Sequence, residues 1–428
     1  MSEPIRARRG MNDILPDEAE RWEALEEILR DWLRSYGYRN IRTPLLEHTA
    51  LFRRAIGEDT DIVEKEMYSF TDELNRESLT LRPEATASVA RAAAEHSFLY
   101  GGGQRLYYIG PMYRHERPQK GRYRQFHQVG AEALGYPGPD IDAELVLMCA
   151  RLWDDLNLAG IRLELNCLGS SAERAAYRKS LVAYLESRES DLDEDSKRRL
   201  RTNPLRVLDS KNPEMQTLIA GAPRLLDALG QDSLKHFEGV QAILKDAGRR
   251  YEINPRLVRG LDYYNLTVFE WTSGDLGAQA AVCAGGRYDG LLEEIGGKPA
   301  PACGFAVGIE RLLALLPDTG ERASPDVYLV NQGERAGRFA FRVAEALREA
   351  GFSVLQHCGS ASFKSQMKKA DGSGAPVAVI VGDEEAEAGE AGVKPLREER
   401  EQFRVPLGSL ADAVADLLFG DAHDKEHP

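Results

Sequence analysis

The stretch Tyr107–Glu132 constrains the fold of this chain more than any other part of the sequence. Two runs rich in aromatic and β-branched residues, Leu106–Tyr113 and Arg124–Ala131, flank a polar centre that contains Pro118 and Gly121. Runs of this kind around a turn-forming centre predict an antiparallel hairpin with a long connection. We therefore expect the rest of the domain to be organised around this hairpin.

One face of the second run is unsuited to a hydrophobic core. Alternate residues of a strand share a face, and here they are Arg124, Phe126, Gln128, Gly130 and Glu132. Burying an arginine, an amide and a carboxylate together is costly unless each finds a partner. Gly130 leaves room for a ligand to approach the backbone. This face is predicted to be the floor of a binding site for a polar ligand.

The connection of the hairpin is a local cation cluster. Arg114, Arg117, Lys120 and Arg122 stand there against Glu116 alone. Such a cluster favours a phosphate ligand. It is equally typical of a solvated hairpin tip with surface ion pairs, and the loop by itself leaves both interpretations open.

Length and composition exclude several classes of protein. With 428 residues, the chain is expected to form two to four domains. No apolar run approaches the roughly 18 residues of a membrane span, and MSEPIRARRG at the start lacks a secretory apolar segment, so a cytoplasmic protein is expected. The net charge of −14 argues against a general nucleic-acid binder but not against a local basic track. Five scattered cysteines without a CxxC pair predict reduced core thiols, not a zinc site or disulfides.

Helices and strands are predicted on both sides of the hairpin. An apolar stripe that begins after Pro16 and ends at Gly37 predicts a helix that lies in the core or at a subunit contact. Further predictions are a strand at Arg39–Thr43, helices at Glu84–Glu95 and Asp140–Asn157, and strands at Ile161–Asn166 and within Arg256–Trp271, Ala281–Leu292 and Ala302–Leu316.

Two later segments differ in character. From Ser171 to Ala247 charged helical patterns dominate, which predicts a helical module inserted between two halves of a sheet domain. After a linker at Glu321–Ser324, strand and helix patterns alternate and predict a small α/β domain with a mostly parallel sheet. Within it, the acidic stretch Asp383–Glu390 is predicted to be a solvated loop.

Several chemically suggestive residues lie near the ends of these elements. Glu84, beside a helix start, either compensates the helix dipole or accepts an ammonium group. Tyr264 either packs through its ring or offers its hydroxyl to a ligand. Arg287-Tyr288-Asp289 is predicted to be an exposed turn. The small residues Gly304, Ala306 and Gly308 share one strand face, which indicates close approach by a ligand or another backbone.

These candidates favour one class of chemistry. Arg114, Arg259 and Arg311 accompany the carboxylates Glu84 and Glu132, without a nucleophile–base pair, a metal-ligand cluster or a dinucleotide fingerprint. Arginines without a base indicate phosphoryl or nucleotidyl transfer, in which positioning and charge neutralisation do most of the catalysis.

The strings themselves carry a family resemblance. The helix and strand that end at Pro44, YRHERPQKGRYRQFHQVGAE, and GFAVGIERL resemble motifs 1, 2 and 3 of class II aminoacyl-tRNA synthetases. RLVRGLDYY and AGGRYDGL resemble the two signatures that, among class II synthetases, are specific to those for histidine. Over essentially its full length, the chain resembles the bacterial histidyl-tRNA synthetases.

This resemblance implies an α+β fold and a two-step reaction. An antiparallel-sheet catalytic domain would span residues 1–170 and 248–320, a helical insertion 171–247, and an α/β anticodon-binding domain 325–428. The implied protein is a homodimer that uses ATP to convert L-histidine to histidyl-adenylate and then acylates the 3′ end of tRNA(His).

The resemblance also assigns roles at the nucleotide. Arg114 would grip the α-phosphate of ATP, with Arg259 on its other side, and Phe126 and Arg311 would sandwich the adenine. Glu116 belongs to the same ATP set. Mg²⁺ would be bound mainly through the β- and γ-phosphates and not by a dedicated protein cluster.

For histidine, the resemblance implies that the ammonium group contacts Glu84, Thr86 and Gln128. The imidazole would contact Glu132 and Tyr264, with Tyr263 and Tyr288 close by. Arg114 and Arg259 would also bind histidine, and these two arginines and Gln128 are the implied catalytic residues. Such a pocket rejects other side chains by roughly 10⁴ or more without proofreading. Arg117, Gln119 and Lys120 would touch the tRNA acceptor end. In the C-terminal domain, Lys364, Lys368 and Lys369 form either an RNA-binding face or a solvated helix face.

Two alternatives to the ligase are considered. One is a non-catalytic, histidine-sensing regulatory paralogue of ATP phosphoribosyltransferase, and the presence of Arg114, Arg259 and the C-terminal block argues against it. The other is a signalling module that senses uncharged tRNA, and the chain has no length left for the additional domain that such modules carry.

Overall fold

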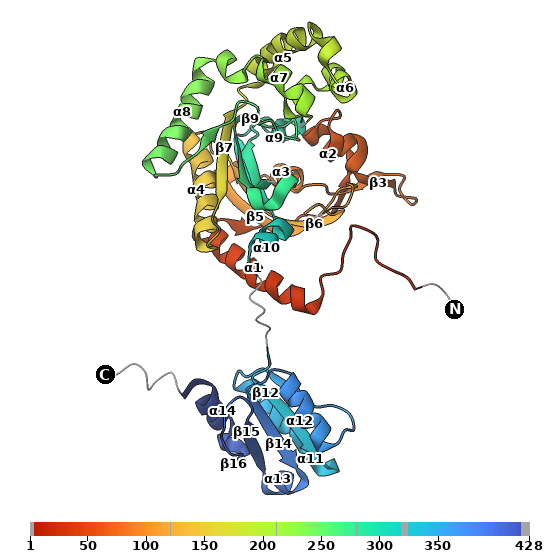
Figure 1. The fold of residues 1–428 in the computed structure, drawn as a ribbon, viewed down its shortest axis with the longest axis vertical. Coiled ribbons are helices and arrows are strands. Elements are labelled where there is room, and N and C mark those ends of the chain that lie inside the picture. The colour runs from red at the N-terminus through yellow and green to blue at the C-terminus, as the bar shows by residue number, and fades with distance from the viewer. Residues whose placement is uncertain (1–3, 120, 211, 280, 318–323, 421–428) are drawn as a thin grey trace. The chain divides into compact units, whose positions relative to one another are not determined.

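The computed structural model describes residues 4–119, 121–210, 212–279, 281–317 and 324–420. The chain divides into two compact units, Met1–Thr319 and Gly320–Pro428, each with its own sheet (Figure 1). The larger unit is built on an antiparallel-rich sheet with helices on both faces, so the predicted α+β class is confirmed.

The eight-stranded sheet of the larger unit has the order β1-β5-β6-β11-β10-β9-β7-β8. Only the outer pairs β1–β5 and β7–β8 are parallel. The strands are β1 Arg39–Asn40, β5 Gln104–Tyr113, β6 Gln125–Leu134, β7 Ile161–Cys167, β8 Glu252–Ile253, β9 Asn265–Ser273, β10 Ala281–Arg287 and β11 Ala302–Gly308. The predicted hairpin is therefore confirmed as β5–β6, the second and third strands of the sheet.

The strand predicted at Arg39–Thr43 is shorter than expected. Its last contact with β5 is the bond from the Ile41 N–H to the Tyr107 carbonyl, 2.8 Å. Beyond it, the Thr43 carbonyl accepts from the guanidinium of Arg82 at 3.3 Å, so a side chain replaces the neighbouring strand.

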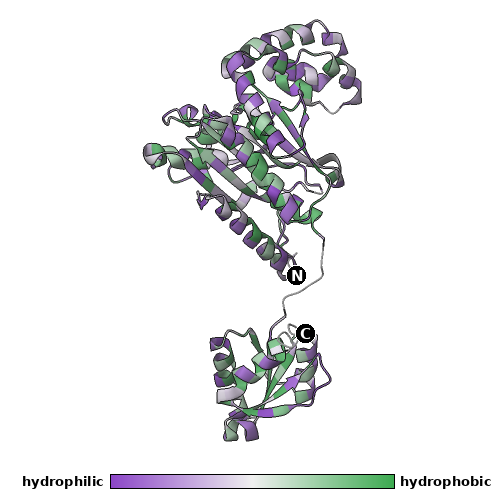
Figure 2. Cartoon of the chain, turned by 90° about the vertical axis from the view of Figure 1, so that its left-hand side faces the viewer, coloured by the Kyte–Doolittle hydropathy of each residue, from purple (hydrophilic) through white to green (hydrophobic). Residues whose placement is uncertain are grey.

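Alternate residues of the strands enter two different cores. Tyr107 packs in the first core, whereas Leu106 and Tyr108 pack in the second. Helices α1 Pro16–Ser35, α4 Pro139–Asp155, α8 Gln231–Asp246 and α10 Ile309–Leu315 contribute to the first core, and α2 Thr49–Ile56, α3 Thr86–Glu95, α5 Ser171–Glu186 and α9 Leu291–Glu294 to the second. Figure 2 shows hydrophobic and hydrophilic residues side by side on the helices, as expected for helices that cover a sheet and also meet solvent.

The segment between β7 and β8 is helical, with α5, α6 Glu194–Thr202, α7 Gln216–Ala220 and α8 joined by short 3₁₀ turns. It begins with a capping box in which Ser170 and Glu173 satisfy each other's backbone N–H groups. A small antiparallel sheet, in the order β2-β4-β3, lies outside the large one and comprises β2 Leu46–His48, β3 Tyr68–Thr71 and β4 Ser78–Leu81.

The smaller unit corrects two sequence-based predictions. Its sheet has the order β13-β12-β14-β15-β16, in which the first three strands are parallel and the last two, which were not predicted, are antiparallel. The acidic segment predicted as a loop contains helix α13, because its acidic residues lie in the first turn and the Glu385 carboxylate accepts from the Gly382 N–H at 3.0 Å. The elements are β12 Val327–Gln332, α11 Glu334–Glu349, β13 Val354–Gln356, α12 Phe363–Gly372, β14 Val377–Gly382, α13 Asp383–Ala388, β15 Glu390–Pro395, β16 Phe403–Pro406 and α14 Leu410–Phe419.

All five cysteines carry free thiols, and four of them are buried as predicted, but Cys358 is exposed. In the part of the chain that the structure describes, no helix is both long and apolar enough to cross a membrane.

A core substitution tests the larger unit by itself. Leu145 is fully buried in α4, so Leu145→Ala is expected to lower the free energy of unfolding by about 2–5 kcal/mol. All four tryptophans lie in this unit, so urea unfolding followed by tryptophan fluorescence reports on it. The control Leu74→Ala, at a side chain 87% exposed, should shift the curve by less than about 0.5 kcal/mol; equal shifts would contradict the assignment of the core.

Candidate active site

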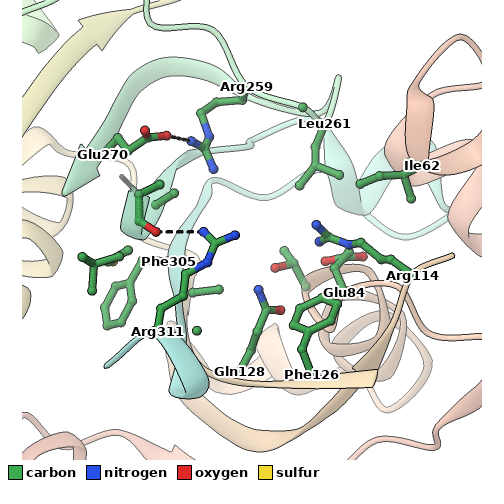
Figure 3. Close-up of a pocket in the computed structure, with 18 of the residues that line it drawn as sticks. Ile62, Glu84, Arg114, Phe126, Gln128, Arg259, Leu261, Glu270, Phe305 and Arg311 are labelled. Carbon is green, nitrogen blue, oxygen red and sulfur yellow. Dashed lines mark hydrogen bonds and ion pairs between the residues drawn. The ribbon is translucent and has the colours of Figure 1, made fainter. Parts of the chain in front are cut away.

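One pocket on the second-core face of the large sheet gathers residues from distant parts of the sequence (Figure 3). Ten of the predicted site residues line it: Glu84, Thr86, Arg114, Glu116, Phe126, Gln128, Arg259, Tyr263, Tyr264 and Arg311. They come from the start of α3 and the residues just before it, the β5–β6 hairpin, the segment before β9, and α10. Of the hairpin face that seemed unsuited to a core, Phe126 and Gln128 therefore line a cavity, whereas Arg124, Gly130 and Glu132 are not part of its lining.

Arg114 is fixed at the end of β5. Its Nε donates to the Pro83 carbonyl at 2.9 Å, and its guanidinium lies 5.2 Å from the centre of the Phe126 ring. Because one edge of the guanidinium is held by the backbone, the remaining N–H groups face the cavity, as Figure 3 shows.

Arg311 is fixed on the opposite wall. Its Nη1 donates to the Ala281 carbonyl at 2.8 Å and its Nε to the Gly121 carbonyl at 3.2 Å. Burial, followed by the like charge of Arg122, lowers the pKa of Arg311. An anion that enters this pocket would relieve that repulsion, which favours a ligand with phosphate groups.

Arg259 lines the same pocket and is held by a carboxylate. Its Nη1 lies 2.6 Å from Glu270 Oε2, and its guanidinium lies 5.7 Å from the centre of the Tyr264 ring. Its Nε is buried and makes no hydrogen bond to the described residues. Arg259 thus retains donor capacity on a side chain whose direction is already set by Glu270 (Figure 3).

Glu84 lies at the start of α3 and also lines the pocket. Helix α3 begins at Thr86, and the Glu84 carboxylate accepts from the Ala87 N–H at 3.1 Å, so it caps the helix. The same side chain is nearly buried, lines the pocket, and has its pKa raised by burial. Gln128 Oε1 is also buried there without a hydrogen-bond partner among the described residues. Both groups can accept from a ligand ammonium.

Glu132 lies behind the pocket wall. It is 1% exposed, accepts from the Thr86 hydroxyl at 2.7 Å, and accepts a second hydrogen bond from the Tyr288 hydroxyl. Burial raises the pKa of Glu132 to about 8, although both hydroxyl donors act in the opposite direction. Glu132 and Tyr288 are therefore joined to the pocket through Thr86 and the surrounding tyrosines.

Three buried tyrosines form one cluster beside this carboxylate. The ring of Tyr263 lies 4.7 Å from that of Tyr264 and 5.5 Å from that of Tyr288. Burial raises the pKa of all three hydroxyls. Each therefore stays protonated; the Tyr288 hydroxyl already donates to Glu132, whereas Tyr264 lines the pocket and can donate to a ligand.

The register between β6 and β11 shows what each small residue of β11 approaches. Gly304 lies opposite Glu132, where any side chain would collide with the carboxylate. Gly130 was predicted to admit a ligand, and this is wrong, because the ring of Tyr108 fills the space above it. Ala306 and Gly308 do line the pocket.

The hairpin connection contains the remaining predicted residues. Arg117 and Gln119 are exposed there, away from the pocket lining, and Lys120 lies outside the described residues. Glu116 lies 3.2 Å from Arg122 in an ion pair that faces the pocket. The ion-pair interpretation thus applies to these two residues.

The prediction that residues 287–289 form an exposed turn is wrong. Arg287 and Tyr288 are almost completely buried, and Arg287 is among the largest side chains with no exposed surface. Its main partner is Asp142 on α4, 2.5 Å away. Because Asp142 lies 145 positions earlier in the chain, no local sequence pattern indicates that Arg287 is buried.

Sequence reasoning also missed three polar residues of the site. Glu270 orients Arg259, and Tyr108 lines the pocket beside Thr86. Glu310 joins α10 to β6, because its carboxylate accepts from the His127 N–H at 2.9 Å and lies 3.0 Å from His127 Nδ1. The period-two alternation of the strands was the available signal for Tyr108 and Glu270.

Comparisons with known proteins show the family of this chain. The family model for histidyl-tRNA synthetase matches residues 10–312, and the model for an anticodon binding domain matches residues 326–417. The chain belongs to the histidyl-tRNA synthetase family. A histidine–tRNA ligase of Aromatoleum aromaticum is 68% identical over 100% of this chain and 98% of its own length, and one of Dechloromonas aromatica is 63% identical over 100% of both.

Solved structures of the family share the fold. The apo histidyl-tRNA synthetase of S. aureus superposes with a TM-score of 0.79 at 35% identity and covers 96% of this chain and 100% of its own. A protein of Bacillus halodurans described as an ATP phosphoribosyltransferase regulatory subunit/histidyl-tRNA synthetase has a TM-score of 0.62 at 22% identity, over 86% of this chain and 97% of its own, and shows the fold alone.

The raised pKa of Glu132 predicts a pH-dependent stability. The folded state keeps the proton of Glu132 up to about pH 8, whereas the ordinary pKa of a glutamate side chain is 4.5. The carboxyl therefore contributes stability that is complete below about 4.5 and is lost as pH rises through about 8. Between these two pH values, the free energy of unfolding of the unsubstituted chain should fall by on the order of a few kcal/mol relative to that of Glu132→Gln.

Urea unfolding followed by tryptophan fluorescence, at several pH values across that window, measures the difference. Glu252→Gln, at an exposed glutamate of β8, is the matched control and should show no such trend. A constant difference between the unsubstituted chain and Glu132→Gln would contradict the buried, proton-bearing carboxyl.

Proposed function

We propose that this chain is a histidine–tRNA ligase that activates L-histidine with ATP and transfers it to the 3′ end of tRNA(His). The observation that carries the proposal is the convergence of Arg114 and Arg259 on one pocket, beside a buried carboxylate and a tyrosine cluster. Cationic groups for a phosphate and neutral donors for an imidazole are thus adjacent. Attack of a histidine carboxylate on a phosphorus atom needs this juxtaposition.

The α-phosphate would lie between Arg114 and Arg259. Each arginine is already oriented, by Pro83 and by Glu270 respectively, so little reorganisation is needed when negative charge grows on the phosphate. Two fixed guanidinium groups then stabilise that charge and hold phosphorus and carboxylate in line. The chain supplies position and electrostatics and forms no covalent intermediate.

The adenine would stack between Phe126 and Arg311. Both residues line the pocket, and each is the immediate neighbour in sequence of a member of the His127–Glu310 pair. Because that pair joins β6 to α10 by three contacts, it fixes the spacing between the two sides of the sandwich. A planar cation over the base adds a cation–π contribution.

Magnesium would be carried on the β- and γ-phosphates. Among the described residues, no group of three or more potential ligands is arranged to hold a metal ion, but single carboxylates such as Glu116 line the pocket. One or two carboxylates together with phosphates suit Mg²⁺, which retains several waters. The ion would neutralise charge on the departing pyrophosphate.

Histidine would bind at the other end of the pocket. Glu84 and Gln128 offer acceptors for its ammonium group, while Glu132 and Tyr264 would bind the two imidazole nitrogens. Thr86 already donates to Glu132, so in addition to its predicted ammonium contact it orients this carboxyl. With its pKa near 8, Glu132 can hold or release a proton as the imidazole requires.

The macromolecular part of the proposal rests on the family. Arg117, Gln119 and Lys120 would contact the acceptor end, and the unit that matches an anticodon binding domain would bind the anticodon. A cytoplasmic homodimer that associates through α1 and the adjacent strand belongs to the same proposal. The domain boundaries predicted from the sequence, 1–170 with 248–320, 171–247 and 325–428, are retained in it.

The regulatory-paralogue alternative is set aside. Relatives named histidine–tRNA ligase align with the whole chain at 58–68% identity. The alignment includes the C-terminal unit that such paralogues usually lack.

Histidine-dependent exchange of pyrophosphate into ATP tests the function directly. Arg259→Ala should lower kcat about 10²- to 10³-fold, because one preorganised donor to the transition state is lost. Arg151→Ala, at an exposed arginine of α4, is the matched control and should leave kcat within about twofold. An Arg259→Ala variant that retains most of its rate would refute the role of this residue, and exchange independent of histidine would refute the function.

The pairing of His127 with Glu310 predicts a selective effect on the nucleotide. Glu310→Ala should raise the KM for ATP about 5- to 20-fold and leave the KM for histidine within about twofold, because only the adenine sandwich loses its spacing. Glu310→Gln keeps an acceptor for the His127 N–H, so its KM for ATP should lie between those of the unsubstituted chain and Glu310→Ala. A parallel rise in both KM values would contradict this account.

A further inference from the structure

A fully buried arginine outside the pocket has no role in the chemistry described above. All three nitrogens of the Arg287 side chain are engaged: Nη2 with Asp142 Oδ1 at 2.5 Å and the Gly138 carbonyl at 2.8 Å, Nη1 with the Tyr136 carbonyl and Asp289 Oδ1 at 3.0 Å each, and Nε with Asp142 Oδ1 at 3.1 Å. These bonds tie the end of β10 to α4 and to the connection that precedes α4. Arg287 is therefore fixed in direction as well as buried.

Stability alone does not account for this arrangement. A buried ion pair can often be replaced by apolar residues of similar volume without loss of stability, so its value must be sought in the geometry that it specifies. The geometry concerns the next residue, Tyr288, whose hydroxyl donates to Glu132.

Arg287 and Tyr288 belong to opposite faces of the sheet. Successive side chains of an extended segment point in opposite directions. Arg287 accordingly reaches Asp142 on α4, a helix of the first core, whereas Tyr288 lies in the second core with the other tyrosines of the pocket. A rotation of the backbone that loosened Arg287 would therefore move the hydroxyl of Tyr288.

Asp289 holds the other side of Tyr288. Its Oδ1 accepts both from Arg287 and from the Ala302 N–H at 2.9 Å, and the Tyr288 N–H donates to the Ala302 carbonyl at 2.7 Å. Tyr288 is thus tied to β11, the strand that also faces Glu132, by its own N–H and by the side chain of Asp289.

The same carboxylate that holds Arg287 also holds the helical segment. His236 on α8 places Nε2 2.7 Å from Asp142 Oδ2, while Arg287 takes mainly Oδ1. Although burial raises it, the hydrogen bond from His236 and the charge of Arg287 together lower the pKa of Asp142. Asp142 is therefore a shared anion between β10 and the last helix of the segment predicted as the insertion.

We propose that Arg287, Asp142 and His236 form a positioning network that holds Tyr288 against Glu132 and so couples the attachment of α8 to histidine recognition. The inference rests on the proposed function, because it assigns the imidazole to Glu132. His236, 11% exposed along its side chain, is the accessible end of the network. Through it, displacement of α8 changes the affinity for histidine and not that for ATP.

The test is made at His236, because removal of Arg287 would leave Asp142 buried without its charged partner. In the pyrophosphate-exchange assay on the full chain, His236→Leu should raise the KM for histidine about 3- to 10-fold with the KM for ATP within about twofold. His236→Gln retains a donor toward Asp142 and should restore the KM for histidine to within about twofold. Lys235→Leu, at the exposed neighbour on the same helix, is the control and should change neither KM.

A double-mutant cycle separates positioning from general damage. In a Tyr288→Phe background the network has lost its hydroxyl, so His236→Leu should add less than about 1.5-fold to the KM for histidine. Equal effects in both backgrounds, or a parallel change in the KM for ATP, would overturn the network. Absence of histidine-dependent exchange in the unsubstituted chain would instead overturn the proposed function, and this inference with it.

Discussion

The pairing of β6 with β11 is the constraint on which the site depends. It sets Gly304 opposite Glu132, Ala306 opposite Gly130, and Gly308 opposite Gln128. Because β11 presents nothing larger than a methyl group at these positions, the polar side chains of β6 can occupy the space that a core strand would fill. A register shift of one residue would turn every one of these groups to the opposite face. Pocket and core are thus fixed by the same hydrogen-bond ladder.

Electrostatics follow from this placement. The guanidinium groups of Arg114, Arg259 and Arg311 are each held on one side by a carbonyl or a carboxylate, so their free donors converge on the same volume. At the other end, burial keeps Glu132 and the tyrosine hydroxyls protonated near neutral pH. A cationic region for phosphates and a neutral region for an imidazole therefore lie side by side, and no covalent catalyst is required.

The sequence was sufficient for the parts of the fold that depend on local periodicity. The hairpin, the small-residue face of β11 and the position of Phe126 and Gln128 in the pocket follow from alternation along strands. Features set by distant partners could not be read in the same way. Arg287 looks exposed beside glycines and an aspartate, yet it is buried because Asp142 on α4 neutralises it. Likewise Gly130 makes room for Tyr108, a cross-strand neighbour, and not for a ligand. In the smaller unit, the acidic run was predicted to be a loop although its charges stabilise the first turn of α13.

The most direct test of the central claim is a crystal structure of the full chain with a non-hydrolysable analogue of histidyl-adenylate. The account predicts that the phosphate lies between the guanidinium groups of Arg114 and Arg259, with the adenine between Phe126 and Arg311 and the imidazole within hydrogen-bond distance of Glu132. An analogue bound with its phosphate away from either arginine, or with its imidazole directed away from the buried carboxyl, would contradict the account.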